Sequence, residues 1–175
     1  MNDILAAWNG KNVQEAVGEV LTCCGSQAWA SEMVAGRPYG SEADLRTAAD
    51  AVWWSLRRAD WLEAFSCHPR IGGVVAGGSG KGALERWSDK EQSQVSLAGD
   101  KVLSELALGN AKYAARFGFT YIVCATGKSA EEMLDILNHR LGNDHATEVR
   151  EAAEQQRQIT QIRLSKWLML DTFQE

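Results

Sequence analysis

His68 lies in the part of the sequence where proton-transfer chemistry is easiest to place. Residues 65–73 read Phe-Ser-Cys-His-Pro-Arg-Ile-Gly-Gly, so a proline follows the histidine directly. Proline fixes its own φ and moves the preceding residue out of the helical region, which predicts that His68 lies where a helix stops. An imidazole with an ordinary pKa of about 6.5 exchanges a proton near neutral pH. His68 is therefore either a general acid or only a helix-end residue.

A second group of polar side chains opens the next long helix. Ser88, Glu91 and Gln92 are spaced i, i+3 and i+4, so they share one face of a first helical turn. Ser88 and Glu91 also form a capping box, which is sufficient reason for both residues. Alternatively, the hydroxyl, carboxylate and amide lie beside helix N–H groups, a setting that suits a polar, anionic ligand.

Arg163 is the third candidate. Ile159, Arg163 and Trp167 follow one another at i+4, which puts the guanidinium on an apolar stripe of the last helix. A charge there is costly unless an anion or several acceptors satisfy it. The partner is either an acidic side chain of the protein or a substrate carboxylate or carbonyl held by the planar guanidinium.

Other catalytic motifs do not match. Residues 77–82 read GGSGKG, but Val75 and Gly82 replace the first glycine and the Ser/Thr of a phosphate-binding loop. His139 and His145 lack the HExxH spacing of a zinc site, and no GxSxG sequence is present. The sequence therefore gives no support to nucleotide, zinc or serine-hydrolase chemistry.

The pattern of apolar residues predicts helices over almost the whole chain. Residues 119–125 (FTYIVCA) alone have the composition of a strand, and no second strand is predicted to pair with them. We therefore expect one extended segment threaded between helices, with backbone N–H and C=O groups that a polar ligand could satisfy. The predicted fold is an all-α, single-domain bundle of about eight or nine helices over residues 1–175.

Several finer features are also predicted. Ser129 and Glu132 form a capping box that opens a helix, and Gly109-Asn110 is expected to break the long helix that Ser88 begins. Trp53, Trp54 and Trp61 are expected in the core, because large aromatic side chains dominate burial.

The composition and charge of the chain argue against several classes of binding partner. The chain has 175 residues and a net charge of -5 without a basic run, which argues against nucleic acid and membrane surfaces. No apolar stretch approaches the ~20 residues of a membrane span, and the first residues do not resemble a signal peptide. Four cysteines without CxxC spacing suit a reducing compartment. We expect a cytoplasmic protein.

Taken together, these segments resemble one family. Residues 60–65 (DWLEAF) lead into 68–72 (HPRIG), and Ser88-x-x-Glu91-Gln92 follows. Residues 117–119 (FGF), 121–125 (YIVCA) and 162–164 (IRL) match in the same order, as do 28–30 (AWA) and 37–39 (RPY). The set is similar to the decarboxylases of 2-oxo-4-hydroxy-4-carboxy-5-ureidoimidazoline (OHCU), which complete the conversion of urate to (S)-allantoin.

The resemblance implies an all-helical homodimer that decarboxylates a small-molecule substrate and needs no cofactor. It implies that His68 donates the proton and that Glu91 is its acidic companion. The implied substrate contacts come from Pro69, Ser88, Gln92, Arg163 and backbone groups of Tyr121, Ile122, Val123, Cys124 and Ala125. Many members have Asp-Leu at the position of Arg70-Ile71, although bacterial forms with Arg-Ile occur. Whether the glycine-rich loop at 72–82 closes over the site as a lid is left open by the resemblance.

Two other functions remain alternatives. One is a non-catalytic helical binding module, in which Ser88 and Glu91 only cap a helix and Arg163 only forms an internal ion pair. The other is a related enzyme that acts on a different purine-ring intermediate. Convergence of His68, Glu91 and Arg163 on one pocket would separate the enzymes from the binding module.

Overall fold

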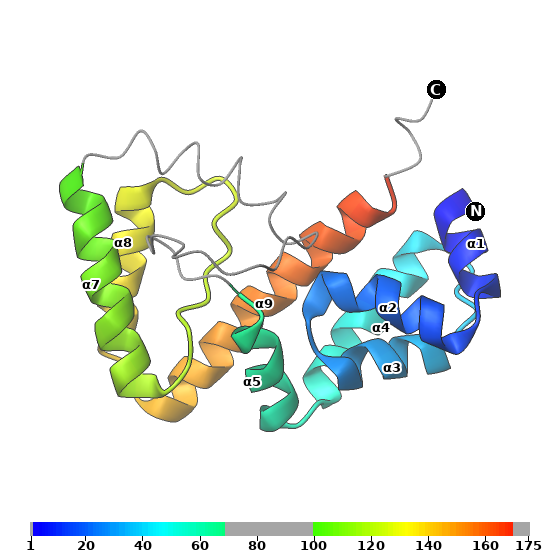
Figure 1. The fold of residues 1–175 in the computed structure, drawn as a ribbon, viewed down its shortest axis with the longest axis horizontal. Coiled ribbons are helices and arrows are strands. Elements are labelled where there is room, and N and C mark those ends of the chain that lie inside the picture. Colours follow the sequence, from blue (N-terminus) through cyan, green and yellow to red (C-terminus); the bar gives the residue numbers. More distant parts are fainter. Residues whose placement is uncertain (1, 69–99, 170–175) are drawn as a thin grey trace. The chain divides into compact units, whose positions relative to one another are not determined.

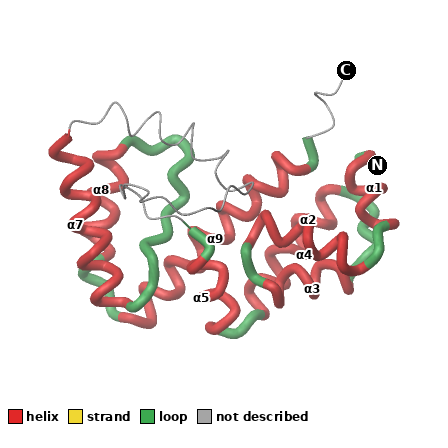
Figure 2. Tube along the Cα trace, viewed as in Figure 1, coloured by secondary structure: helices red, strands yellow, loops and turns green. Residues whose placement is uncertain are grey.

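The computed structural model of the protein describes residues 2–68 and 100–169, which belong to two compact units. The first unit is Met1–Cys67 with Gln156–Glu175, and the second is the continuous stretch His68–Gln155. The described residues form helices joined by loops, with no strand among them (Figure 1; Figure 2). The predicted all-α fold is confirmed.

Among the described residues, five helices lie in the first unit and two in the second, and one long helix contributes to both. They are α1 (Asp3–Gly10), α2 (Val13–Cys24), α3 (Gln27–Ala35), α4 (Glu42–Ser55), α5 (Arg58–Ser66), α7 (Asp100–Phe117), α8 (Ala130–Arg140) and α9 (His145–Trp167). The residues of α9 up to Gln155 belong to the second unit, and those from Gln156 belong to the first.

Most of these helices begin behind a side chain that accepts a hydrogen bond from a first-turn N–H, as helix N-termini require. Ser129 and Glu132 form the predicted capping box of α8. α5 begins at Arg58 and has its acceptor inside the helix. Asp60 lies inside its first turn and accepts from the N–H of Arg57 at 3.1 Å, so the acid satisfies an exposed donor from within the helix.

Indole N–H groups are paired with backbone carbonyls in the core of the first unit. Trp8 donates to Ala16, and Trp29 donates to Ala49. Trp53 is buried as predicted, but Trp54 is 38% exposed, which contradicts its predicted place in the core. Consecutive residues of a helix point about 100° apart, so both cannot face the same core.

The end of α5 is set by close packing within the first unit. α3 packs against α2, α4 and α5, and Phe65 of α5 is fully buried. Gly25, which ends α2 with φ of 85°, lies so close to Cys67 that a Cβ added to it would be 3.0 Å from the Cys67 Cβ. Only glycine combines this left-handed φ with so close an approach. The chain leaving α5 is therefore fixed as far as Cys67.

In the second unit, α7 packs along α8. α7 is continuous through Gly109 and Asn110, so the predicted helix break there is wrong. A Cβ at Gly109 would lie 2.6 Å from Cδ2 of Leu137 in α8, and Asn110 donates from its side chain to the Leu106 carbonyl at 2.9 Å. Gly109 thus permits the close approach of two helices instead of ending one.

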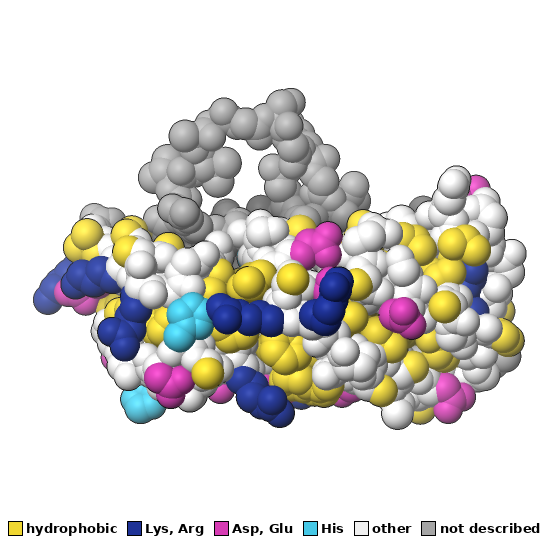
Figure 3. All heavy atoms as spheres, turned by 90° about the horizontal axis from the view of Figure 1, so that it is seen from below, with side chains coloured by type: hydrophobic (Ala, Val, Ile, Leu, Met, Phe, Trp, Pro, Cys, Tyr) yellow, Lys and Arg dark blue, Asp and Glu magenta, His cyan; other side chains and the backbone are white. Residues whose placement is uncertain are grey.

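Charged side chains are interspersed with apolar and uncharged ones on the face that Figure 3 shows. This distribution agrees with the mixed charge pattern of the sequence. None of the helices in the described part of the chain is long and apolar enough to cross a membrane.

Candidate active site

His68 follows a helix end, as the sequence predicts. α5 ends at Ser66, and the N–H of Cys67 bonds to the Ala64 carbonyl at 3.2 Å. His68 is half-buried and comes two residues after the helix. Its role as an acid stays a prediction.

Four of the predicted site residues lie outside the described residues. They are Pro69, Ser88, Glu91 and Gln92. The undescribed range 69–99 also contains Arg70, the glycine-rich loop at 72–82 and the predicted start of a helix at Ser88. The described residues resume at Asp100, where α7 begins.

The predicted extended segment lies between two left-handed glycines. Gly118 ends α7 with φ of 78°, and Gly127 has φ of 79° in the turn that leads to α8. Between them, residues 119–125 form neither helix nor strand, and Tyr121, Ile122, Val123 and Cys124 are buried. Buried backbone groups need hydrogen-bond partners, so the partners of this segment decide how it is held.

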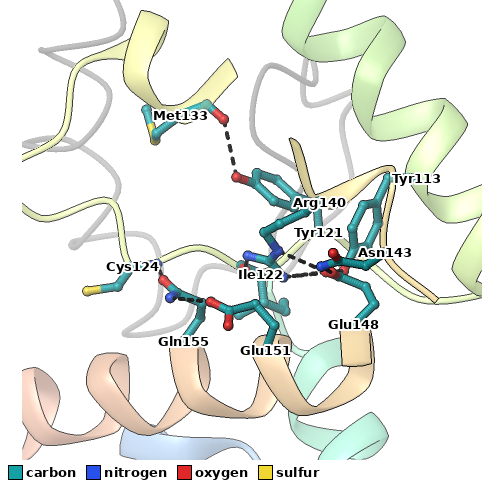
Figure 4. A network of polar contacts seen from close by, with 10 residues as sticks. All are labelled: Tyr113, Tyr121, Ile122, Cys124, Met133, Arg140, Asn143, Glu148, Glu151 and Gln155. Atoms are coloured by element: carbon teal, nitrogen blue, oxygen red, sulfur yellow. Dashed lines mark hydrogen bonds and ion pairs between the residues drawn. The ribbon is translucent and has the colours of Figure 1, made fainter. Parts of the chain in front are cut away.

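A buried ion pair holds the middle of the segment (Figure 4). Arg140 donates from Nη2 to Glu148 Oε1 at 2.6 Å, and the two side chains are 4% and 0% exposed. Another nitrogen of the same guanidinium, Nη1, donates to the carbonyl of Ile122 at 2.7 Å. Asn143 and Tyr113 also donate to the Glu148 carboxylate, so both of its oxygens are bonded. The pair therefore has the additional hydrogen bonds that a buried pair requires.

A second set of side chains holds Cys124. Its N–H donates to Gln155 Oε1 of α9 at 2.9 Å, and its carbonyl accepts from Lys128 Nζ at 2.7 Å. Figure 4 shows Gln155 between Cys124 and Glu151. The segment is thus tied at Ile122 and at Cys124, two residues apart.

This spacing separates the two edges of the segment. In extended backbone, alternate residues direct their N–H and C=O groups to the same edge. The tied groups belong to Ile122 and Cys124, so in extended backbone the N–H and C=O of Val123 face the opposite edge. Among the described residues, Val123 has no hydrogen-bond partner for either group. The five predicted contact residues are therefore not equivalent, since described residues bond to the backbone of Ile122 and Cys124 but not to that of Val123.

Two buried tyrosines, Tyr121 of the segment and Tyr113 of α7, act as neutral hydrogen-bond donors. Burial raises the pKa of the Tyr121 phenol well above its usual range, and its hydroxyl donates to the Met133 carbonyl at 3.2 Å. Burial, and then the hydrogen bond to Glu148, raise the pKa of Tyr113. Neither phenol is a candidate base near neutral pH.

Arg163 lies in the first unit, in the half of α9 that begins at Gln156. Its side chain is half-buried, as a cation on an apolar stripe should be. Burial raises the pKa of Cys23 to about 11 and that of Cys24 to about 12, and the positive charge of Arg163 opposes both shifts. The guanidinium is therefore close enough to both thiols to interact with them electrostatically, but its contact with substrate stays a prediction.

The described residues do not form a metal site, since no group of three or more His, Cys, Asp or Glu side chains among them could hold an ion.

Arg140, Glu148 and Gln155 were not predicted from the sequence. Met133, Leu137 and Arg140 are spaced i, i+4 and i+7 in α8, so Arg140 continues a buried stripe. The same signal, a cation on an apolar stripe, identified Arg163. Its partner Glu148 could not be chosen from the many acidic residues without the tertiary fold.

The fold and site define an all-helical protein in which a buried extended segment is held by side chains from two helices. The family model for OHCU decarboxylase matches residues 9–165. The chain therefore belongs to the OHCU decarboxylase family.

Two curated relatives show how far the similarity extends. The chain is 34% identical over 154 residues to an OHCU decarboxylase of Amia calva, covering 86% of this chain and 84% of that protein. It is 35% identical over 148 residues to the uric acid degradation bifunctional protein TTL of Arabidopsis thaliana. That match covers 85% of this chain but spans only 46% of the plant protein.

Solved structures agree with the family assignment. An OHCU decarboxylase crystallised in the presence of (S)-allantoin has a TM-score of 0.73 and 34% identity, covering 86% of this chain and 96% of that one. An (S)-allantoin synthase structure has a TM-score of 0.66 at 18% identity and covers 93% of this chain and 53% of that one. The second likeness concerns the fold alone.

Proposed function

We infer that the protein decarboxylates 2-oxo-4-hydroxy-4-carboxy-5-ureidoimidazoline to (S)-allantoin, the last step of urate degradation. The observation that carries this function is the family match across residues 9–165, together with 34% identity to the decarboxylase solved with allantoin. That similarity covers nearly all of the solved chain. It favours an enzyme over a non-catalytic helical module.

The reaction asks for hydrogen-bond donors and one placed acid. Loss of carbon dioxide leaves an electron pair that must be delocalised into the ring. The hydroxyl-bearing carbon that lost the carboxylate becomes a carbonyl, and the neighbouring carbon that carries the ureido group must take up a proton. His68 is the proposed donor of that proton, and Glu91 is the carboxylate that favours the charged imidazole. Delivery from one face gives a single enantiomer.

The substrate's anionic and carbonyl groups need fixed partners. Arg163 is the proposed partner, because its guanidinium presents several donors in one plane. Pro69, Ser88 and Gln92 are proposed to line the same site. The residues 121–125 supply backbone contacts, and the tied groups of Ile122 and Cys124 support Val123 as the main contributor.

A coupled assay tests the function. Urate and the two upstream enzymes generate the unstable substrate in place, and circular dichroism follows optically active allantoin. Addition of the protein should make the (S)-enantiomer appear faster than the spontaneous reaction does. An unchanged rate would refute the proposed function.

We also propose that the enzyme works in the cytoplasm as a homodimer. The four cysteines are free thiols, which agrees with a reducing compartment. Val13 and Leu108 are 64% and 63% exposed, so apolar surface is present outside the core. Light scattering of the purified protein measures its mass, and a monomer at micromolar concentration would exclude the stable dimer.

A further inference from the structure

We propose that Gln155 is a positioning residue, which fixes residues 121–125 so that the backbone of Val123 binds the substrate. The inference rests on the proposed function, because it assumes that this segment contacts the ureidoimidazoline. It concerns a side chain of α9 that holds the binding segment through one hydrogen bond.

The hydrogen bonds of Gln155 fix the orientation of its amide. The N–H of Cys124 can only donate, so the group facing it at 2.9 Å is the amide oxygen. The amide nitrogen then faces Glu151 and donates to its Oε1 at 3.0 Å. Since Glu151 is one helical turn before Gln155, the carboxylate holds the amide in the one orientation that accepts from Cys124.

The consequence for the substrate follows from the backbone direction. Cys124 N–H and Ile122 C=O point to the edge that the protein itself occupies, through Gln155 and Arg140. Val123 therefore offers one N–H donor and one C=O acceptor at the other edge. A ureido group also carries a donor beside an acceptor in one plane, so the two can pair as neighbouring strands do.

Gln155 is more informative to vary than Arg140, which is part of a nearly inaccessible ion pair. Gln155→Met keeps the length of the side chain and removes the acceptor. Because a backbone contact made in both ground and transition states affects mainly binding, KM and the Kd for (S)-allantoin should rise about fivefold. The kcat should stay within about twofold.

The control is Gln14→Met, the same change at an exposed residue of α2 whose side chain bonds to none of the described residues. It should leave KM and Kd unchanged. Hydrogen exchange gives a readout without turnover, and amides of residues 121–125 should exchange faster in Gln155→Met than in the wild type. A purely structural role would lower the amount of active enzyme, seen as a lower apparent kcat, and would leave KM unchanged.

A charge-conserving exchange provides the second test. Gln155→Glu alone places two carboxylates together and should raise KM at neutral pH. Combining it with Glu151→Gln restores one carboxylate and one amide, with the carboxylate accepting from Cys124, and should return KM to within about twofold of wild type.

The outcomes are distinguishable. A wild-type protein that forms no (S)-allantoin overturns the proposed function itself. An active wild type with unchanged KM and Kd in Gln155→Met overturns the inference alone. If Gln155→Met does not fold, a double variant that folds but keeps the raised KM of Gln155→Glu overturns it equally.

Discussion

Arg140 and Glu148 form an ion pair at 2.6 Å although neither side chain has meaningful contact with solvent. The pair joins the end of α8 to the start of α9 across the turn at Gly142. Nη1 of Arg140 donates to the Ile122 carbonyl, so this one guanidinium links two helices to the extended segment. A group normally avoided in protein interiors is thus a central support of the second unit.

Removing the charge of Glu148 should be severely destabilising. Glu148→Gln leaves the Arg140 cation buried without its counter-charge, which should reduce the free energy of unfolding by about 3–5 kcal/mol. Urea denaturation measures the change. Arg57→Ala, which breaks the exposed pair with Asp60, should cost less than about 1 kcal/mol. Equal losses in the two variants would contradict the importance of the buried pair.

His68→Ala should remove proton delivery without unfolding the protein. The residue is half-buried and lies beyond the last turn of α5, so the melting temperature should change little. The kcat should fall by roughly 100-fold or more if His68 is the general acid. His139→Ala, at an exposed position of α8, is the matched control and should keep full activity. Full activity in His68→Ala would exclude the residue from the mechanism.

Arg163→Lys keeps the charge and loses the planar set of donors. If Arg163 holds the substrate, KM should rise about tenfold, since hydrogen bonds to charged groups are worth about 1.5 kcal/mol or more. Arg58→Lys, at an exposed arginine of α5, should leave KM unchanged. Steady-state kinetics distinguish the two variants. A wild-type KM in Arg163→Lys would mean that the guanidinium has only a structural role.

The helical glycines Gly18, which is exposed, and Gly109, which is buried, should respond oppositely to alanine. Gly18→Ala meets no atom within 4 Å and should stabilise α2 by about 0.5–1 kcal/mol through helix propensity. Gly109→Ala places its Cβ against the fully buried Leu137 and should destabilise by about 1 kcal/mol or more despite the same gain. Thermal unfolding of both variants checks the signs, and stabilisation by both would refute the packing role of Gly109.

Asp144 should contribute a stability that depends on pH. Its carboxylate accepts from the N–H and hydroxyl of Thr147 and from the N–H of Ala146, and these bonds lower its pKa. Because the native pKa lies below the unfolded value of about 3.9, the charge stabilises above that pH. The contribution is lost as pH falls through the native pKa.

Asp144→Asn tests this dependence, because the amide oxygen can still cap α9 without carrying a charge. The wild type should have the higher melting temperature at pH 7, and the difference should shrink towards pH 3. A difference that is the same at both pH values would show that the charge plays no part.

Local chemistry made some features predictable. The proline after His68 marks a helix end, and the spacing of Ser129 and Glu132 marks a helix start, because neighbours in the chain determine both. The unpaired character of residues 119–125 was also predictable, since the sequence offers no partner strand. These features depend on few long-range contacts.

Other features depend on contacts that the sequence does not reveal. Gly109 reads as a helix break until Leu137 is seen against it. Trp54 reads as core until its neighbour Trp53 takes the buried position. Gln155 reads as an ordinary polar residue of a polar helix, and only the approach of Cys124 gives it a role.

The division of α9 between the two units has a consequence for synthesis on the ribosome. Residues 68–155 are contiguous, so the second unit has all its parts before the last helix is complete. The first unit lacks Gln156, which donates to Cys24, and Arg157, which pairs with Asp50, until the second part of α9 has been synthesised. Since ribosomes add about 5–20 residues per second, residues 1–67 are synthesised several seconds before the part of α9 that completes their unit. During that delay its tryptophan-rich interior is a natural target for chaperones.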